Sequence, residues 1–276
     1  IYAMFSAALI DPLPEERREF LAVMGLADEF TVSMAQKISG REDAGVLLSA
    51  LTRKNAFVTR LPDGATYRFH HMMKACAEQA FSALPIERQR LYRDRYGRFY
   101  ETGGQYLHAL SAYRKSGNFA ALCRVVQEDA GILLASLDPS LVLEVLGQCP
   151  KEVLKEYPLA ILVLMRSMFN WRQIPKMLEL KALFSASMEE HPELPAEERG
   201  NLLGECDLIQ SFLFYNNITE MSRLHRSASE QMSRPSVSIR SQGGWTFGSP
   251  SVLMMFHREP GGLKSELAEM DECMPH

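Results

Sequence analysis

The sequence predicts a mostly α-helical protein, in which a winged-helix module with a short β-hairpin precedes an irregular helical solenoid similar to tetratricopeptide repeats. Three observations lead to this fold class. Two strand-like runs flank a Pro-Asp-Gly turn within residues 55–69. Short helical patterns stand before that hairpin, and another helical pattern follows it directly. The rest of the chain repeats apolar residues at helical spacing, separated by polar turns.

The composition is that of a folded, soluble protein large enough for two domains. The chain has 276 residues, 46% of them hydrophobic and 23% charged. Its net charge of −4 gives no overall reason to bind nucleic acid or a membrane. The longest apolar run, residues 159–165, is far shorter than the ~20 residues of a membrane helix. We therefore expect a cytoplasmic protein without a membrane segment.

The cysteines predict free thiols in a reducing compartment. None of the five belongs to a C-x-x-C pair, and their number is odd. This spacing predicts neither a disulfide framework nor a metal site. They are Cys76, Cys123, Cys149, Cys206 and Cys273.

Three short helices are predicted before the hairpin. Pro14 and the acidic residues after it favour a helix start, and Gly25 can stop that helix. Thr31 is a suitable N-cap for a second helix that ends near Gly40. Asp43 can cap a third helix, in which apolar residues recur at helical spacing.

The hairpin and a fourth helix complete the module. Phe57-Val58-Thr59 is rich in strand-forming residues, Asp63-Gly64 is a strong turn signal, and Tyr67-Arg68-Phe69 supplies the return strand. A helical stripe then starts at His70. This order of elements predicts a winged-helix module over residues 1–85.

Two basic features raise DNA binding as an alternative. The third helix, residues 43–54, carries Arg53 and Lys54 only at its end, whereas a helix that reads the major groove presents several basic or amide side chains. The next helix, residues 86–100, carries five arginines between Arg88 and Arg98. Because acidic residues are interspersed, we interpret it as a solvated helix face rather than an anion-binding patch.

Residues 86–233 predict a TPR-like helical array. Aromatic helix ends, polar turns and new amphipathic helices recur, the new helices starting near Phe119, Ile174 and Ile218. These starts are separated by 55 and 44 residues, unlike the regular period of about 34 in tetratricopeptide repeats. We therefore expect an irregular solenoid with an extended surface for ligands or proteins.

Residues 234–276 predict a loop and the start of further helices of the same array. The stretch from Arg234 to Ser251 is rich in Gly, Pro and Ser but has no Gly-Lys-Ser/Thr, so it is not a P-loop. Trp245 and Phe247 are candidate contacts for a ligand or partner, and a plain connecting loop is the alternative. A last helix follows, from Lys264 to Met270.

An ordered set of motifs resembles the large ATP-binding LuxR-type transcription regulators of the MalT-like group. The set comprises Asn55-Ala56-Phe57-Val58, Tyr67-Arg68-Phe69-His70-His71 and a later pattern with Tyr100, Ala109, Tyr113 and Gly117-Asn118-Phe119. The resemblance covers roughly residues 1–130. It implies a central winged-helix and sensor segment of a longer protein, with a nucleotide-binding domain upstream and a LuxR-type DNA-binding domain downstream.

The same resemblance assigns His70 a role. In related signalling ATPases a winged-helix histidine contacts the ADP phosphates, and His70 occupies the matching place, with His71 as second choice. An imidazole at a helix N-terminus suits a phosphate. The alternative is that either histidine caps the helix or packs against the hairpin.

Together these observations predict a regulatory segment that is not itself an enzyme, because no catalytic constellation is present. It would couple an unknown small-molecule inducer or protein effector to nucleotide-dependent transcription, with self-association possible. We expect ATP or ADP as a cofactor of the full-length protein and none in this segment. We expect DNA to be bound by a domain absent from this chain. The alternative is a helical-repeat interaction scaffold without ATPase or DNA-binding domains.

Overall fold

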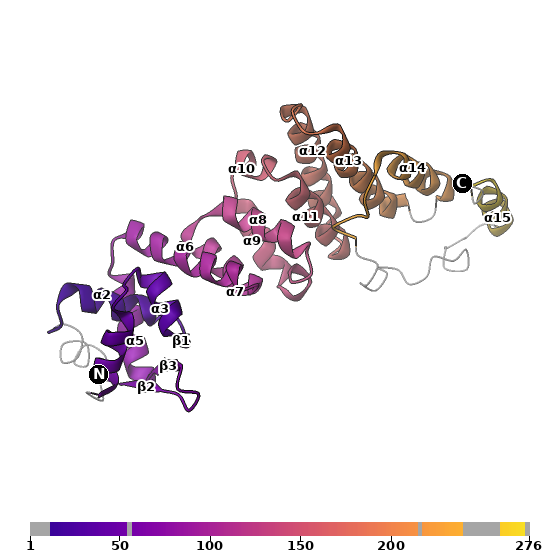
Figure 1. Ribbon diagram of the computed structural model, residues 1–276. Helices are drawn as coiled ribbons and strands as arrows, with labels where there is room; N and C mark the ends of the chain where they lie inside the picture. The colour runs from indigo at the N-terminus through magenta and orange to yellow at the C-terminus, as the bar shows by residue number, and fades with distance from the viewer. Residues whose placement is uncertain (1–11, 54–56, 215–216, 240–259, 274–276) are drawn as a thin grey trace. The chain divides into compact units, whose positions relative to one another are not determined.

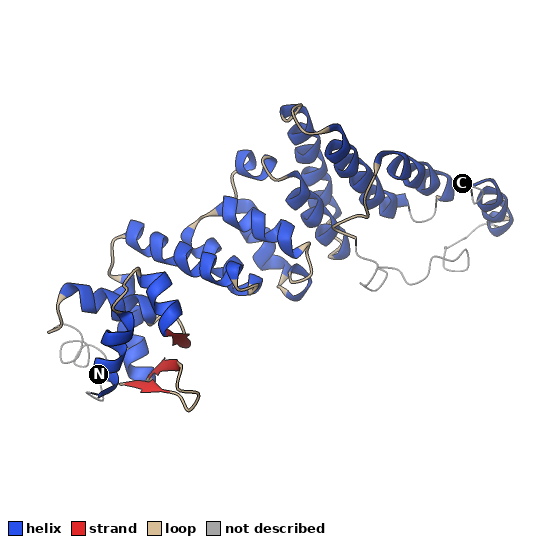
Figure 2. Ribbon diagram, viewed as in Figure 1, coloured by secondary structure: helices blue, strands red, loops and turns tan. Residues whose placement is uncertain are grey.

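The computed structural model describes residues 12–53, 57–214, 217–239 and 260–273. The chain divides into two compact units, residues 1–118 and 119–276, and each is described by itself. Both consist mostly of helices (Figures 1 and 2), which confirms the predicted fold class. The domain boundaries predicted at residues 85 and 233 stay predictions.

The first unit contains a winged helix followed by two further helices. Within the described residues, the winged helix comprises four helices. A small antiparallel sheet lies beside them (Figure 2). In chain order, the first unit comprises α2 (Glu15–Met24), β1 (Glu29–Thr31), α3 (Val32–Ser39), α4 (Ala44–Arg53), β2 (Val58–Arg60), β3 (Thr66–Phe69), α5 (His71–Ser82), α6 (Ile86–Thr102) and α7 (Tyr106–Ser116).

The sheet has three strands, not the two that the sequence predicted. Its order is β1-β3-β2, and both pairs are antiparallel. The hairpin is as expected, with Val58 opposite Phe69. The additional strand is β1, in which Phe30 pairs with Tyr67. Its three residues offer a single apolar side chain, so they carry no alternating pattern, and the strand exists because β3 provides a partner.

The predicted start and end signals of α3 are confirmed. Thr31 accepts a hydrogen bond from the Met34 N–H on its Oγ1 at 3.2 Å, and Gly40 ends the helix in the left-handed conformation with φ 77°. Helix α4 begins at Ala44, directly after Asp43. The Asp43 carboxylate is held by Arg41, whose Nε and Nη2 donate to it over 2.8 and 2.9 Å.

The hairpin turn is fixed by Asp63 and Gly64. The Asp63 carboxylate accepts hydrogen bonds from the backbone N–H groups of Ala65 and Thr66, both at 3.0 Å, and from the Thr66 hydroxyl. These bonds lower the pKa of Asp63, with the Thr66 hydroxyl as the largest cause. Gly64 has a φ of 68°, a left-handed conformation that other residues adopt with strain.

Helix α6 shares the core of the winged helix. Tyr92 and Tyr96 are buried in the same cluster as Phe30, Ile38 and the other core residues of the module. The Tyr96 hydroxyl donates to the carbonyl oxygen of Val23 at 2.8 Å. Burial raises the pKa of Tyr96 well above its ordinary value, so the phenol stays a donor.

Helices α6 and α7 pack closely because a glycine allows it. A Cβ placed on Gly97 would lie 2.4 Å from Cε1 of Tyr113. Tyr113 is buried, and its hydroxyl donates to the Glu101 carboxylate at 2.6 Å. The first unit therefore extends from the winged helix through α7 as one continuous packing arrangement.

The second unit consists of packed helices. Neighbours along the chain form close pairs, notably α11 with α12 and α13 with α14. Its α-helices are α8 (Phe119–Asp129), α9 (Pro139–Gln148), α10 (Lys151–Lys155), α11 (Pro158–Asn170), α12 (Ile174–Glu190), α13 (Ala196–Ser211), α14 (Ile218–Gln231) and α15 (Gly262–Cys273), with 3₁₀ turns at Leu134–Ser136 and Phe212–Phe214.

Helix α11 is the centre of this unit. Residues 160–165 are all buried, and the helix packs against α8, α10, α12 and α13. The apolar run noted in the sequence is therefore a buried core helix, as predicted. Within the part of the chain that the structure describes, no helix combines the length and apolar character needed to cross a bilayer.

A buried carboxylate fixes the segment after α14. Glu205 of α13 is completely buried and accepts hydrogen bonds from the backbone N–H groups of Val237 at 3.0 Å and Ser238 at 2.5 Å. Arg234 lies 3.5 Å from the same carboxylate. These contacts hold residues 234–238 against α13, at the start of the predicted loop.

Candidate functional site

The candidate site lies where β3 turns into α5. Strand β3 ends at Phe69 and α5 begins at His71, so His70 is the N-cap residue, at the helix start where the sequence placed it. Its N–H donates to the Phe57 carbonyl oxygen at 2.8 Å. Its ring Nδ1 accepts a hydrogen bond from the Met72 N–H at 3.4 Å. The hairpin and the helix together fix the backbone at His70.

This geometry gives His70 a defined chemical character. Because Nδ1 acts as an acceptor, the neutral ring carries its proton on Nε2. The residue is exposed, so Nε2–H can donate to an outside acceptor. The unpaired N–H groups of a helix N-terminus also favour negative charge. The arrangement can therefore accept an anion such as a phosphate group.

Two rings surround the imidazole of His70. The Phe57 ring centroid lies 5.7 Å away and that of His71 lies 4.1 Å away. Phe57 itself has a φ of 58°, in the left-handed region that bulky residues rarely occupy. His70 thus both caps α5 and packs against the hairpin, which is the structural role weighed as its alternative. Phosphate sensing by His70 or His71 stays a prediction.

The neighbouring cations already have carboxylate partners. Lys74, in the first turn of α5, pairs with Asp28, and Arg68 of β3 pairs with Glu29. The hydrogen bond from Lys74 is the largest cause that lowers the pKa of Asp28. A phosphate at this place would therefore find the imidazoles and the helix N-terminus, but little unpaired positive charge from this part of the module.

Helix α4, the third helix of the module, does not present a DNA-reading face. Ala44, Leu47 and Leu48 are buried, and Val46 is 70% exposed. Among the described residues of α4, the one basic side chain is that of Arg53, in the last turn. The described part of this helix therefore offers few of the basic and amide side chains that usually read base edges.

The arginines of α6 mostly serve to hold the first unit together. Arg88 forms an ion pair with Glu19 of α2, and Tyr92 donates to the same carboxylate at 2.9 Å. Arg93 donates to the carbonyl of residue 115 at 3.1 Å, and Arg95 to that of residue 38 at 3.1 Å. Arg88, Arg90 and Arg98 are exposed, as expected for a solvated helix face, but Arg88, Arg93 and Arg95 also connect the helix to other parts of the first unit. Sequence spacing could not reveal this, because the partners lie far away in the chain.

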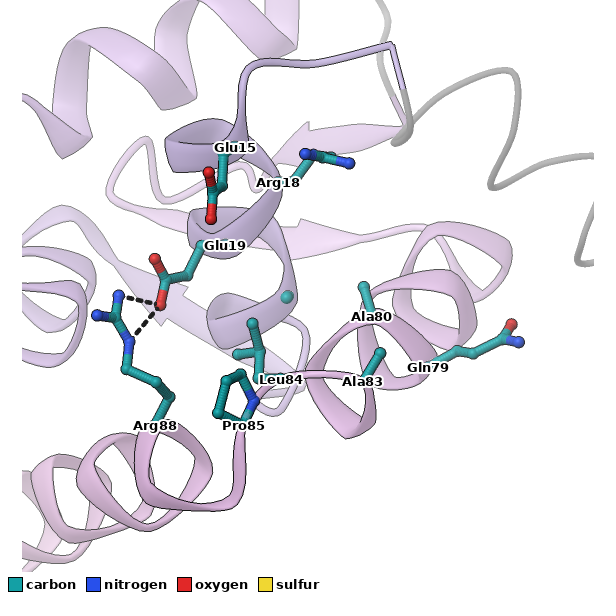
Figure 3. A pocket seen from close by; sticks show the side chains of 10 residues that line it. Glu15, Arg18, Glu19, Gln79, Ala80, Ala83, Leu84, Pro85 and Arg88 are labelled. Atoms are coloured by element: carbon teal, nitrogen blue, oxygen red, sulfur yellow. Dashed lines mark hydrogen bonds and ion pairs between the residues drawn. The ribbon is translucent and has the colours of Figure 1, made fainter.

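A shallow groove of about 600 Å³ lies between α2 and the corner that joins α5 to α6. Figure 3 shows Arg88 bonded to Glu19 at one side and Leu84 and Pro85 in the middle. The predicted site residues lie elsewhere. Lining residues are Glu15, Arg18, Glu19, Ala22, Gln79, Ala80, Ala83, Leu84, Pro85 and Arg88.

Two further candidates cannot be placed. Trp245 and Phe247 lie outside the residues that the structure describes, so their role as ligand or partner contacts stays a prediction. Within the described part of the chain, no cluster of three or more His, Cys, Asp or Glu side chains could hold a metal ion.

Comparison with known proteins identifies the first part of the chain. Residues 6–89 match the MalT winged helix domain. The chain is also 32% identical over 88 residues to the HTH-type transcriptional regulator MalT of Vibrio cholerae serotype O1. This match covers 31% of this chain and 10% of that protein. The resemblance to MalT-like regulators is therefore confirmed, and it rests on the winged helix.

Proposed function

We propose that this chain, which begins with a MalT-type winged helix, is the central regulatory part of a MalT-like transcription regulator. The match of residues 6–89 carries this proposal, and the position of His70 at the N-cap of α5 supports it. The chain itself performs no catalysis. In the cytoplasm it relays a signal between a nucleotide and DNA that are bound by other domains.

The winged helix relays the nucleotide state through His70. The Nε2–H of this residue donates to a phosphate oxygen of ADP and stabilises the resting state. Because Lys74 and Arg68 already pair with carboxylates, the positive charge that holds the phosphates comes from an upstream nucleotide-binding domain. Release of this contact frees the winged helix to move. ATP or ADP is thus a cofactor of the full-length protein.

The second unit receives the signal. Its close helix pairs, α11 with α12 and α13 with α14, support a TPR-like surface for a small-molecule inducer or a protein effector. A ligand that prefers the active arrangement shifts the population toward it. Self-association then brings together the LuxR-type DNA-binding domains at the C-terminal side. The same helix pairs also suit the second candidate, an interaction scaffold without ATPase or DNA-binding domains.

Reading the gene on both sides of this segment separates the two candidates. The regulator predicts a Gly-x-x-x-x-Gly-Lys-Ser/Thr motif upstream, for a P-loop, and a helix-turn-helix pattern downstream. The full-length protein should then retain ADP during purification. An open reading frame with neither motif would contradict the regulator and favour the scaffold.

A further inference from the structure

A histidine with one buried ring nitrogen begins the connection between α12 and α13 in the second unit. His191 is the C-cap residue of α12, and its side chain is 19% exposed. Its Nδ1 lies 2.8 Å from Oε1 of Glu193, in the same connection. Because a carboxylate only accepts hydrogen bonds, Nδ1 carries the proton of the neutral ring and Nε2 is an acceptor. Nε2 is buried and has no hydrogen-bond partner among the described residues.

A second carboxylate lies close to this buried nitrogen. Oε1 of Glu156 is 3.7 Å from Nε2 of His191, slightly beyond hydrogen-bond distance. Glu156 is the C-cap residue of α10, and its side chain is 63% exposed. While the ring is neutral, two acceptors oppose one another here, and a buried acceptor without a donor is unfavourable. A proton on Nε2 would turn this nitrogen into a donor within reach of Glu156.

The other charged groups around His191 already have partners. Lys155 of α10 lies 2.6 Å from Glu190 of α12 and 3.9 Å from Glu152. Arg199 of α13 donates to the backbone carbonyl oxygen of His191 at 3.4 Å. These contacts do not depend on the charge of the imidazole, so they link α10, α12 and α13 whether or not the ring is protonated.

The surroundings of the ring favour its protonated form. The hydrogen bond with Glu193 is the largest cause that raises the pKa of His191. Burial opposes this shift, and the negative charges of Glu156 and Glu190 add to it. Since an unperturbed imidazole titrates near pH ~6.5, His191 changes its charge at a somewhat higher pH, close to neutrality.

We propose that His191 is a proton-operated clamp that ties the end of α10 to the connection between α12 and α13. When the solution is acidified, Nε2 takes up one proton from water and donates it in a hydrogen bond to Glu156. The exposed Glu156 side chain closes the gap of 3.7 Å by moving about 1 Å, to a charge-assisted hydrogen bond. The imidazolium then bridges Glu156 and Glu193. When the pH rises, the proton leaves and this bridge opens.

The clamp acts where several helices of the second unit meet. Helix α10 packs against α8, α11 and α12, and α11 packs against α13. A bond from the end of α10 to the connection before α13 therefore stiffens a junction between neighbouring helix pairs. Protonation becomes an input to this unit that is separate from the nucleotide signal proposed for His70.

The test follows the ring and the helix in the folded chain between about pH 5.5 and ~9. Nitrogen NMR of the histidine rings should show neutral His191 with its proton on Nδ1. Hydrogen exchange, corrected for its intrinsic pH dependence, reports on the Leu154 N–H, which donates to the Pro150 carbonyl oxygen at 3.1 Å. This N–H should be protected about two- to fivefold better when the ring is protonated, the effect of one exposed ion pair.

Two variants of α10 separate the clamp from a general effect of pH. Glu156→Ala should lower the pKa of His191 and remove the pH dependence of the protection at Leu154. Glu152→Ala is the matched control, because it removes a carboxylate one turn earlier that pairs with Lys155. This control should leave the titration of His191 and the pH dependence of the protection unchanged.

Three results would overturn the proposal. One is a neutral His191 ring with its proton on Nε2. Another is protection of Leu154 that is the same with the ring neutral and protonated. The third is a pH dependence that Glu156→Ala leaves unchanged. Circular dichroism at both ends of the pH range shows that each comparison is made on folded protein. The outcome is independent of the regulator assignment.

Discussion

The contact between α6 and α7 gives a sharp prediction, because Gly97→Ala places a methyl group inside the volume of the Tyr113 ring. The new Cβ would lie 2.4 Å from Cε1, 2.6 Å from Cδ1 and 2.8 Å from Cζ. Non-bonded carbon atoms prefer about 3.5–4.0 Å. The ring or the helix must therefore move by roughly 1 Å, in a place where Tyr113 is 2% exposed.

The expected loss of stability is about 2 kcal/mol. Overpacking a well-packed core costs about 1–3 kcal/mol. A displaced ring also weakens the 2.6 Å hydrogen bond from Tyr113 to Glu101, which contributes about 0.5–1.5 kcal/mol. Alanine in a helix interior regains about 1 kcal/mol relative to glycine. The steric clash outweighs the gain in helix propensity because the buried Tyr113 ring has little room to move.

Hydrogen exchange of the amides in α6 and α7, together with urea denaturation, measures this loss. Tyr113→Leu removes the ring, so Gly97→Ala in that background should become neutral or stabilising. Gly147→Ala in α9 is a matched control, because its Cβ meets nothing within 4 Å; it should stabilise by up to about 1 kcal/mol. The reasoning fails if Gly97→Ala is neutral, or if its cost is the same with and without the tyrosine ring.

Three further predictions follow from buried or paired groups. Tyr96→Phe removes the 2.8 Å hydrogen bond from the buried hydroxyl to α2, and urea denaturation should show a loss of about 1 kcal/mol. Glu205→Gln replaces one carboxylate oxygen, which accepts hydrogen bonds, by an NH₂ group close to the backbone N–H groups of Val237 and Ser238. In a hydrogen-exchange measurement the Val237 N–H should therefore exchange faster, while the N–H groups of α13 stay protected. The hydrogen bond to Glu193 raises the pKa of His191 in the folded chain. The wild-type chain should therefore be more stable than His191→Gln, and this difference in the free energy of unfolding is fully present below pH ~6.5. This difference in stability should disappear as the pH rises through the pKa of His191 in the folded chain. Urea denaturation of both chains between about pH 5.5 and ~8.5 can follow the loss.

Local signals in the sequence predict much of the winged helix. Thr31 and Gly40 bound α3, and Asp63-Gly64 marks the hairpin, because caps and turns depend on residues close in the chain. Strand β1 could not be predicted in this way. Its single buried residue, Phe30, gives no alternating pattern, and its partner strand starts at Thr66.

At the candidate sites, the sequence predicts local features but not contacts between residues that are distant in the chain. The motif Tyr67-Arg68-Phe69-His70 places His70 at the helix start, and the structure confirms that place. The pairing of Arg88 with Glu19 and the hydrogen bond from Arg95 to the carbonyl oxygen of residue 38 join residues too far apart for any spacing rule. Tertiary packing alone creates these contacts, so they were visible only in the folded chain.

The central claim is that His70 senses a nucleotide phosphate, and ADP retention by the full-length protein tests it most directly. His70→Asn is the informative variant, because asparagine is a good N-cap and preserves the start of α5 while it removes the imidazole. His71→Asn is the control. We predict that His70→Asn folds normally, loses bound ADP and raises basal transcription, whereas His71→Asn does neither. Unchanged ADP content and basal activity in His70→Asn would contradict the claim and leave His70 as a helix cap.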